Sequence, residues 1–345
     1  MKPGVAVFHV PGRRYYADTC EPLKQAVERG DLRLSARVHG AYPGLELPAE
    51  ALPEVRTVGY WDADHDQTWG LDWHRNEGVE FTYVARGKVG FGVGSPNHGG
   101  PLKSGALTIT RPWQQHRVGD PVVTACRLHW LILDVGVRRP NQPWRWPSWL
   151  VLSAADLAEL TAALSHNEQT VWHADEAIAH YFEKLAEVTA AAADQASESH
   201  LKLYVNGLLL ALLDLLRRNQ PTLDPSLSST QRTVELFLAD LPEHLDHDWT
   251  LSSMAAACGL GRSRFTYYCR QITNRSPTEV LVRCRIEAAS RLLLSEREMT
   301  VTDVALDCGF GSGQYFATLF RQHVGCSPRQ FRDGCGDCPV AVAHA

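Results

Sequence analysis

The stretch VTDVALDCGFGSGQYFATLFRQHVGCSPRQFR, residues 301–332, decides the architecture of the C-terminal part of the chain, because a second copy of its pattern precedes it. Residues 251–260 align with residues 301–310 at an offset of fifty. Beyond the turn, Arg270 aligns with Arg321 at an offset of fifty-one, so the second copy carries one extra residue between its two helices. We therefore predict a duplicated helix-turn-helix.

Each copy divides its second helix into an inward and an outward face. In the first copy, a short helix ends at Gly259, since glycine readily adopts the left-handed conformation that closes a helix. After the turn, apolar side chains recur at helical spacing, at Phe265, Tyr268, Cys269 and Ile272. The second copy repeats the first three of these positions at an offset of fifty-one, at Phe316, Leu319 and Phe320. The opposite faces remain available to contact another molecule.

Capping motifs mark three helix starts independently of the apolar pattern. These capping boxes are Ser276 to Glu279, Thr300 to Asp303 and Ser327 to Gln330, and proline occupies the first helical position in the first and last. Between the two copies, an apolar repeat predicts a connecting helix of about 17 residues, roughly 25 Å long. Such a helix could hold two recognition helices about one DNA turn apart, near 34 Å.

Charge separates this part of the chain from the rest. Residues 249–332 contain eleven arginines, no lysine and six acidic residues, so their net charge is +5 (11 − 6). The whole chain has a formal net charge of −5, which leaves −10 for the remainder. This asymmetry is expected when an anion-binding module is joined to a module of another kind.

Residues 301–332 resemble the signature of the arabinose-regulator (AraC/XylS) family of bacterial transcription factors, and the first copy matches its partner motif more loosely. The resemblance covers about a hundred residues and implies a domain that binds double-stranded DNA. The first copy departs from the family at Gly261, usually a capping serine, and at Cys269, usually phenylalanine. These departures concern the stability and the contacts of its recognition helix.

The outward faces supply the predicted DNA-binding residues. The base-reading candidates are Ser263, Thr266, Tyr267, Gln314 and Thr318. Gln314 is the sharpest of them, because a glutamine amide can pair bidentately with adenine in the major groove. The candidates for phosphate contacts that hold the register are Arg262, Arg264, Arg270 and Arg321, one of which could instead reach guanine.

Strands dominate the prediction from Trp61 to Val137. Apolar and polar residues alternate from residue 79 to residue 93, with a turn predicted at Arg86-Gly87, so this segment is expected to form a hairpin. Further alternating segments indicate an antiparallel barrel or jelly roll. The expected fold class is therefore multidomain α+β, with an N-terminal antiparallel cupin-like β barrel, a helical linker and a C-terminal all-α tandem helix-turn-helix.

Within the predicted barrel, several residues resemble the two cupin motifs in order and approximate spacing: His74, Glu80, Gly87, Gly105, Pro112 and His116. His74, Glu80 and His116 are candidate metal ligands, since imidazole and carboxylate suit zinc, iron or manganese. However, Asn76 replaces the second histidine of metal-binding cupins, Gln114 replaces a glycine, and sensor cupins of this family commonly bind a small ligand without metal. We therefore expect no metal and no other cofactor.

Tryptophans point to the chemistry of the ligand. Nine of the ten tryptophans precede residue 173, and their flat faces can pack on sugar rings while polar neighbours bind hydroxyl groups. A carbohydrate effector is thus predicted, although residues 143–149 could instead plug a barrel end or cover an interdomain seam. The predicted ligand-binding residues are His74, Asn76, Glu80, Trp113, Gln114 and His116.

Four segments are expected along the chain. They are a ligand-sensing domain (1–165), a helical coupling and dimerisation region with a linker (166–229), the DNA-binding domain (230–332) and a disordered tail (333–345). Residues 200–218 carry more leucines than one helical stripe needs, and these could pack within the chain or against a second subunit. The family resemblance favours a homodimer. The tail contains Cys335, Cys338 and His344, a weak pattern for zinc.

Composition indicates the cellular compartment in which the protein is expected. The notable features are the lack of a membrane-length apolar run, the lack of a signal-peptide pattern at the N-terminus, and nine cysteines, an odd number. We expect a cytoplasmic protein that does not contact membranes and whose cysteines are reduced thiols.

These features together predict a sequence-specific DNA-binding transcriptional regulator that responds to a sugar or related metabolite. We expect it to act as an activator, and we do not expect it to be an enzyme. RNA polymerase is a further expected partner. The alternative is a metal-dependent cupin enzyme tethered to a DNA-binding domain, and Asn76 argues against it. A third interpretation, an architectural DNA binder without a ligand, is disfavoured by the large acidic N-terminal part.

Overall fold

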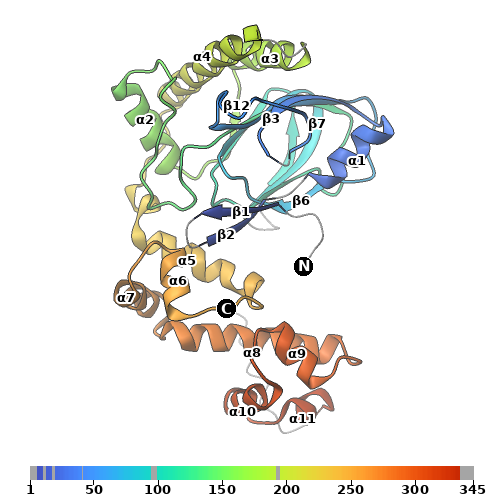
Figure 1. Ribbon diagram of the computed structural model, residues 1–345, viewed down its shortest axis with the longest axis vertical. Coiled ribbons are helices and arrows are strands. Elements are labelled where there is room, and N and C mark those ends of the chain that lie inside the picture. Colours follow the sequence, from blue (N-terminus) through green and yellow to red (C-terminus); the bar gives the residue numbers. More distant parts are fainter. Residues whose placement is uncertain are drawn as a thin grey trace. The chain divides into compact units, whose positions relative to one another are not determined.

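The computed structural model describes residues 6–10, 13–17, 20–40, 42–94, 99–191 and 195–334 (Figure 1). The chain forms two compact units, Met1–Ser229 and Thr230–Ala345. The cysteine and histidine pattern of the tail lies outside the described residues.

The first unit combines strands and helices (Figure 1). Its strands are β1 (Ala6–Val10), β2 (Arg13–Ala17), β3 (Arg33–Val38), β4 (Leu45–Glu46), β5 (Val55–Ala63), β6 (Leu71–His74), β7 (Val79–Val93), β8 (Gly99–Lys103), β9 (Ala106–Thr110), β10 (His116–Val118), β11 (Cys126–Leu133) and β12 (Val171–His173). Its helices are α1 (Glu21–Arg29), α2 (Ala154–Ser165), α3 (Glu176–Ala190), α4 (Gln195–Asn219) and the 3-10 helix η1 (Pro225–Ser228).

The main sheet follows the order β12-β9-β7-β11-β5-β3-β4, with β8 and β10 paired to β7, and β6 paired to β10. Neighbouring strands are antiparallel except β3 and β4, which are parallel. In the described part of the chain the path ends at β12 and β4, which are not paired with each other. The sheet-rich domain is thus confirmed, but its sheet is mixed and open rather than a closed antiparallel barrel.

The predicted hairpin at Arg86-Gly87 is wrong, because β7 runs without a turn from Val79 to Val93. Its first half pairs with β9 and β11, and its second half pairs with β8 and β10. Gly87 has a φ of 80°, and a Cβ atom there would lie 2.2 Å from the carbonyl oxygen of Ala125. The glycine is therefore required by a close approach of another strand and does not mark a chain reversal.

Helices α3 and α4 share one hydrophobic core with the sheet, which includes Phe81, Phe182 and Leu212. The segment Glu198–Asn219 of α4 is long and apolar enough to cross a membrane by length and composition, contrary to the expected lack of such a run, but 56% of its most apolar stretch is buried inside the protein. Its leucines thus pack within the chain, apart from Leu203 and Leu210, which are exposed.

The second unit is helical in its described residues. Its elements are α5 (Thr230–Asp240), the 3-10 helix η2 (Leu241–His244), α6 (Leu251–Ala257), α7 (Arg262–Thr273), α8 (Pro277–Ser295), α9 (Val301–Asp307), α10 (Gly313–Val324) and α11 (Pro328–Arg332). One core gathers α5, η2, α6 and α7, and another gathers α9, α10 and α11. Helix α8 contributes to both cores, through Leu281 to the first and Leu293 to the second.

Capping follows the sequence prediction with one difference. Complete capping boxes open α8 at Ser276 and α11 at Ser327. At α9 the Thr300 hydroxyl accepts a hydrogen bond from the Asp303 amide and donates to its carboxylate, so only half of the capping box is formed. An unpredicted capping box opens α6 at Thr250.

The cysteines are mostly as expected. Six cysteines form no disulfide bond: Cys20, Cys126, Cys258, Cys269, Cys284 and Cys308. Cys326 departs from the prediction, since it is disulfide-bonded.

Candidate nucleic-acid interface and sensor cavity

Helix α7 presents its predicted base-reading residues on one face. Ser263 and Arg270 are exposed, Tyr267 is 58% exposed, and Thr266 is half-buried at the edge of this face. On the opposite side Phe265 is fully buried in the core. The helix begins at Arg262 although the cap residue before it forms no side-chain hydrogen bond, so the departure from serine removes a contact without removing the helix.

Helix α10 presents the corresponding face of the second copy. Gln314, Thr318 and Arg321 are exposed and occupy successive turns. The Thr318 hydroxyl donates a hydrogen bond to the backbone carbonyl of Gln314 at 3.0 Å, which leaves its methyl group and a lone pair for a base edge. Tyr315 is 56% exposed and aligns with Arg264 of α7, an aromatic position that the sequence pattern did not single out.

The predicted phosphate anchors are exposed, and Arg270 interacts with an acid, Glu279, only at longer range. In the described chain, no carboxylate forms an ion pair with the exposed guanidinium groups of Arg262, Arg264, Arg270 and Arg321. By contrast, Arg283 on α8 pairs with Glu287 at 2.7 Å. Exposed and unpaired guanidinium groups beside two polar helix faces suit the binding of a phosphate backbone.

Arg285 has a structural role that the sequence analysis missed. Its Nε and Nη2 donate to the carbonyl oxygen of Leu245, at 3.2 and 3.1 Å, and Nη2 also donates to the carbonyl of His247 at 2.9 Å. Gly309, in the turn after α9, packs directly on this junction. Thus one arginine counted toward the positive charge joins helix α8 to the segment that follows η2.

A small cavity of about 40 Å³ lies in the first unit. Apolar walls from several strands enclose it, and a polar end is formed by Tyr42, His74, Asn76 and Glu80. His74 and His116 face each other across β6 and β10, with ring centroids 4.4 Å apart. Four of the six predicted ligand-binding residues are thereby brought together at one place.

Glu80 is the centre of the polar end. Its Oε2 lies 2.8 Å from His116 Nε2 and accepts a hydrogen bond from Asn76 Nδ2 at 3.0 Å. Burial by itself would raise the pKa of this carboxyl, but the hydrogen bond from His116 and the charges of His116 and His74 outweigh it, so the pKa lies below its usual value. The polar end thus presents an ionised carboxylate.

Of the predicted ligand-binding residues, His74, Asn76 and Glu80 line the cavity and His116 contacts Glu80. The remaining two, Trp113 and Gln114, do not line it. Gln114 Oε1 accepts hydrogen bonds from the backbone N–H and the guanidinium of Arg111. Trp113 packs against the core beneath the helices. In their place the structure adds Tyr42, whose buried hydroxyl has no hydrogen-bond partner within the described residues. Tyr42 precedes the two-residue strand β4, and nothing in the surrounding sequence pattern indicated that it lines the cavity.

The candidate metal ligands do not form a metal site. Although His74, Glu80 and His116 are neighbours, the residues that the structure describes contain no group of three or more His, Cys, Asp or Glu arranged to hold a metal ion. His116 already directs Nε2 to Glu80 and Nδ1 to the backbone carbonyl of Gln114, 3.1 Å away. These contacts leave neither ring nitrogen free for a metal.

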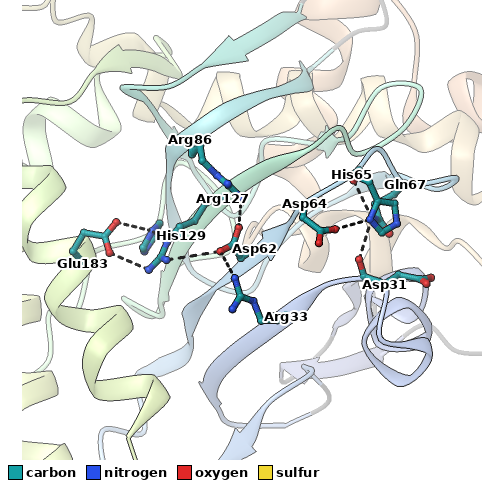
Figure 2. Close-up of polar contacts among 10 residues, drawn as sticks. All are labelled: Asp31, Arg33, Asp62, Asp64, His65, Gln67, Arg86, Arg127, His129 and Glu183. Carbon is teal, nitrogen blue, oxygen red and sulfur yellow. Dashed lines mark hydrogen bonds and ion pairs between the residues drawn. The ribbon is translucent and has the colours of Figure 1, made fainter.

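A second polar network joins the sheet to helix α3 (Figure 2). Figure 2 shows Arg127 between Asp62 and Glu183, and its Nη2 donates to Glu183 at 3.0 Å. Arg127 Nε donates to Nε2 of His129, which is only 1% exposed. Burial, with the charge of Arg127, lowers the pKa of His129 to about 4, so this histidine is neutral and its contact with Glu183 is not an ion pair.

Replacing His129 by glutamine should reduce the acid sensitivity of the first unit. The folded-state pKa lies below the unfolded value, so the unfolded chain alone binds a proton between about pH 6.5 and 4, and stability falls as the pH drops through this range. Over this pH range, proton binding to His129 in the unfolded chain lowers the free energy of unfolding by about 3 kcal/mol. Urea unfolding at pH 7 and pH 4.5 measures it. Parallel losses in the wild type and H129Q would contradict this assignment.

The second unit's paired helix-turn-helix motifs, joined by α8 and each with an exposed polar face, define a tandem helix-turn-helix domain. Residues 254–334 match the family model described as a helix-turn-helix domain.

Two relatives are each named HTH-type transcriptional activator RhaS. The protein from Enterobacter sp. (strain 638) is 32% identical over 142 residues, which cover 41% of this chain and 50% of that protein. The protein from Escherichia coli O157:H7 (strain EC4115 / EHEC) is 34% identical over 127 residues, which cover 37% and 45%. The match therefore spans about half the length of these relatives.

Solved structures are similar as well. The DNA-binding domain of AdpA, a global transcriptional factor in complex with a target DNA, is 30% identical and covers 29% of this chain and 90% of its own, with a TM-score of 0.29. Unsaturated fatty acid bound ToxT from Vibrio cholerae strain SCE256 is 13% identical and covers 80% and 94%, with a TM-score of 0.36.

Proposed function

We propose that this protein is a sequence-specific DNA-binding transcriptional regulator of the activator type. The observation that carries the proposal is the pair of exposed faces on α7 and α10, flanked by four guanidinium groups without acidic partners among the described residues. The similarity to transcriptional activators supports it. Bases would be read by Ser263, Thr266, Tyr267, Gln314 and Thr318, while the arginines bind phosphates.

Replacing Gln314 by alanine should relax sequence preference at one base position of the operator. The exposed amide can donate to and accept from one adenine, and a good bidentate pair contributes roughly 1–3 kcal/mol of discrimination. Binding-site selection from a random DNA library measures the change. His323→Ala is the control, since this exposed residue lies nine positions on, at the opposite side of α10. Equal loss of affinity for all sequences would reject a base-reading role.

The cavity of the first unit is proposed as the effector site. Tyr42, His74, Asn76 and Glu80 offer hydrogen-bond partners, and Trp61 and Trp130 line the same cavity, a combination that suits a carbohydrate. At about 40 Å³ the cavity has room for only a few water molecules, so a sugar requires its walls to move apart. Binding would then favour one arrangement of the sensor over another.

A thermal-shift screen of sugars, polyols and uronic acids tests this site. A compound at about 100 times its dissociation constant should stabilise the folded chain by roughly 2.7 kcal/mol. Glu80→Gln should abolish that stabilisation, because it removes the carboxylate at the polar end. A compound that stabilises the wild type and the Glu80→Gln variant equally binds elsewhere.

The proposed assembly is a cytoplasmic homodimer that contacts RNA polymerase. Leu203 and Leu210 are 61% and 45% exposed and lie two turns apart on α4, so a second copy of this helix could cover them. Sedimentation equilibrium of the wild type and of Leu203→Lys tests the dimer, and identical association would exclude this surface.

A further inference from the structure

Arg111, which follows strand β9, is buried in an unusual way. It is 2% exposed, and its guanidinium group donates only to uncharged oxygen atoms. These acceptors are the backbone carbonyls of Ile109, Leu164, Asn167 and Gln169 and the side-chain oxygen of Gln114. Three of the carbonyls belong to the segment 164–169, which runs from the last turn of α2 towards β12. One side chain therefore joins two segments that are far apart in the sequence.

Burying a charged guanidinium group is energetically unfavourable unless its hydrogen bonds keep their geometry. No carboxylate in the described residues forms an ion pair with Arg111; the charge of Glu168 contributes only a longer-range attraction. Burial accordingly lowers the pKa of the guanidinium to about 10. Because a buried cation without its acceptors is strongly unfavourable, the segment 164–169 must follow any movement of Arg111.

On one side, Arg111 is connected to the cavity. Its neighbour Thr110 donates a hydrogen bond from its hydroxyl to Glu80 Oε2 at 3.3 Å. Gln114 Oε1 accepts from the Arg111 backbone N–H at 3.0 Å, and the Gln114 carbonyl lies 3.1 Å from His116 Nδ1. Both Glu80 and His116 thus contact the turn that holds Arg111.

On the other side, the segment held by Arg111 contacts the end of the first unit. The carbonyl oxygen of His166 accepts a hydrogen bond from the Asp224 amide at 2.7 Å. The Nε2 atom of His166 lies 3.0 Å from the hydroxyl of Ser228. Two residues later, Thr230 begins α5, the first helix of the DNA-binding unit.

We propose that Arg111 is a positioning residue that couples the cavity to residues 224–229, the segment leading into the DNA-binding unit. A change at Glu80 or His116 moves the turn, the rigid fork of the guanidinium moves the segment 164–169, and His166 then holds or releases residues 224–229. This regulatory role rests on the proposed function, but the coupling itself requires no effector.

Hydrogen exchange of the full-length chain, followed by mass spectrometry, tests the coupling. Arg111→Lys keeps the charge and loses the fork, so amides in residues 222–229 should exchange about fivefold faster. Glu80→Gln should also accelerate exchange there in the wild type, and should add nothing in the Arg111→Lys background. His129→Gln, which disturbs the α3 contact instead, should leave residues 222–229 unchanged.

Additive effects of Glu80→Gln and Arg111→Lys, or no effect of either on residues 222–229, would overturn the proposal. If Arg111→Lys fails to fold, Ser228→Ala tests the same coupling from its exposed end, since coupling is reciprocal. This variant should change exchange in residues 110–116, and unchanged exchange there would equally overturn the proposal. If the coupling is observed but no effector changes the DNA affinity of the chain, that result would instead count against the proposed function.

Discussion

Replacing Gly309 by alanine should destabilise the second unit by about 3–5 kcal/mol. Gly309 has a φ of 79°, and a Cβ atom would lie 1.9 Å from the carbonyl oxygen of Leu245 and 2.6 Å from Arg285 Nη2. Neither the carbonyl of Leu245 nor the guanidinium of Arg285 can move away from an added Cβ atom without straining the hydrogen bond between them. Backbone strain and steric overlap therefore add, and the junction between α8, α9 and the segment after η2 is lost.

Differential scanning calorimetry of the full chain measures this effect as a lower transition temperature of the second unit. Gly334→Ala is the matched control, since Gly334 has a φ of 78° and no atom within 4 Å of the place that a Cβ atom would occupy. It should show only the strain, roughly 1 kcal/mol. Similar losses for both variants would mean that the contact with Leu245 is unimportant.

Replacing Arg270 and Arg321 together by alanine should weaken DNA binding about 100-fold for every sequence alike, if each guanidinium makes one charged hydrogen bond to phosphate. The slope of log K against log salt should decrease by about 2, since each phosphate contact releases nearly one counterion. Both arginines are exposed, occupy corresponding positions in the two copies, and have no acidic partner among the described residues. Fluorescence anisotropy titrations at several salt concentrations measure both quantities.

Arg283→Ala provides the control for net charge. Arg283 is already paired with Glu287 on α8, so its removal should change the salt dependence much less than loss of either recognition-helix arginine. If the double variant instead lost affinity for only one operator sequence, with the salt dependence unchanged, Arg270 and Arg321 would be base readers and not phosphate contacts.

Local signals explain why the helical part could be predicted. The stop at Gly309, the caps at Ser276 and Ser327 and the outward faces depend on residues within a few turns of one another. The capping box at Thr250 was missed because serine, rather than glutamate or glutamine, occupies its third helical position. Here the error concerned the chemistry of one residue and left the helix boundary intact.

Non-local contacts explain the errors in the first unit. Arg86-Gly87 has the composition of a turn, yet Gly87 is present because the carbonyl of Ala125 passes 2.2 Å from the place of a Cβ atom. Gln114 was predicted to bind the ligand, yet its side chain accepts hydrogen bonds from Arg111 and does not line the cavity. Ala125 is distant from Gly87 in the sequence. Arg111 is only three residues from Gln114, but its guanidinium is held in place by the distant carbonyls of residues 164–169.

By itself, the sequence determined the duplicated helix-turn-helix, because helix periodicity, caps and exposed arginines are properties of neighbouring residues. Only the tertiary structure decided that the sheet is open, that Tyr42 joins Glu80 at the cavity, and that Arg111 lies between this cavity and residues 164–169. Strand pairing and buried polar contacts depend on which distant segments meet, and their hydrogen bonds can be assigned only once those segments are in place.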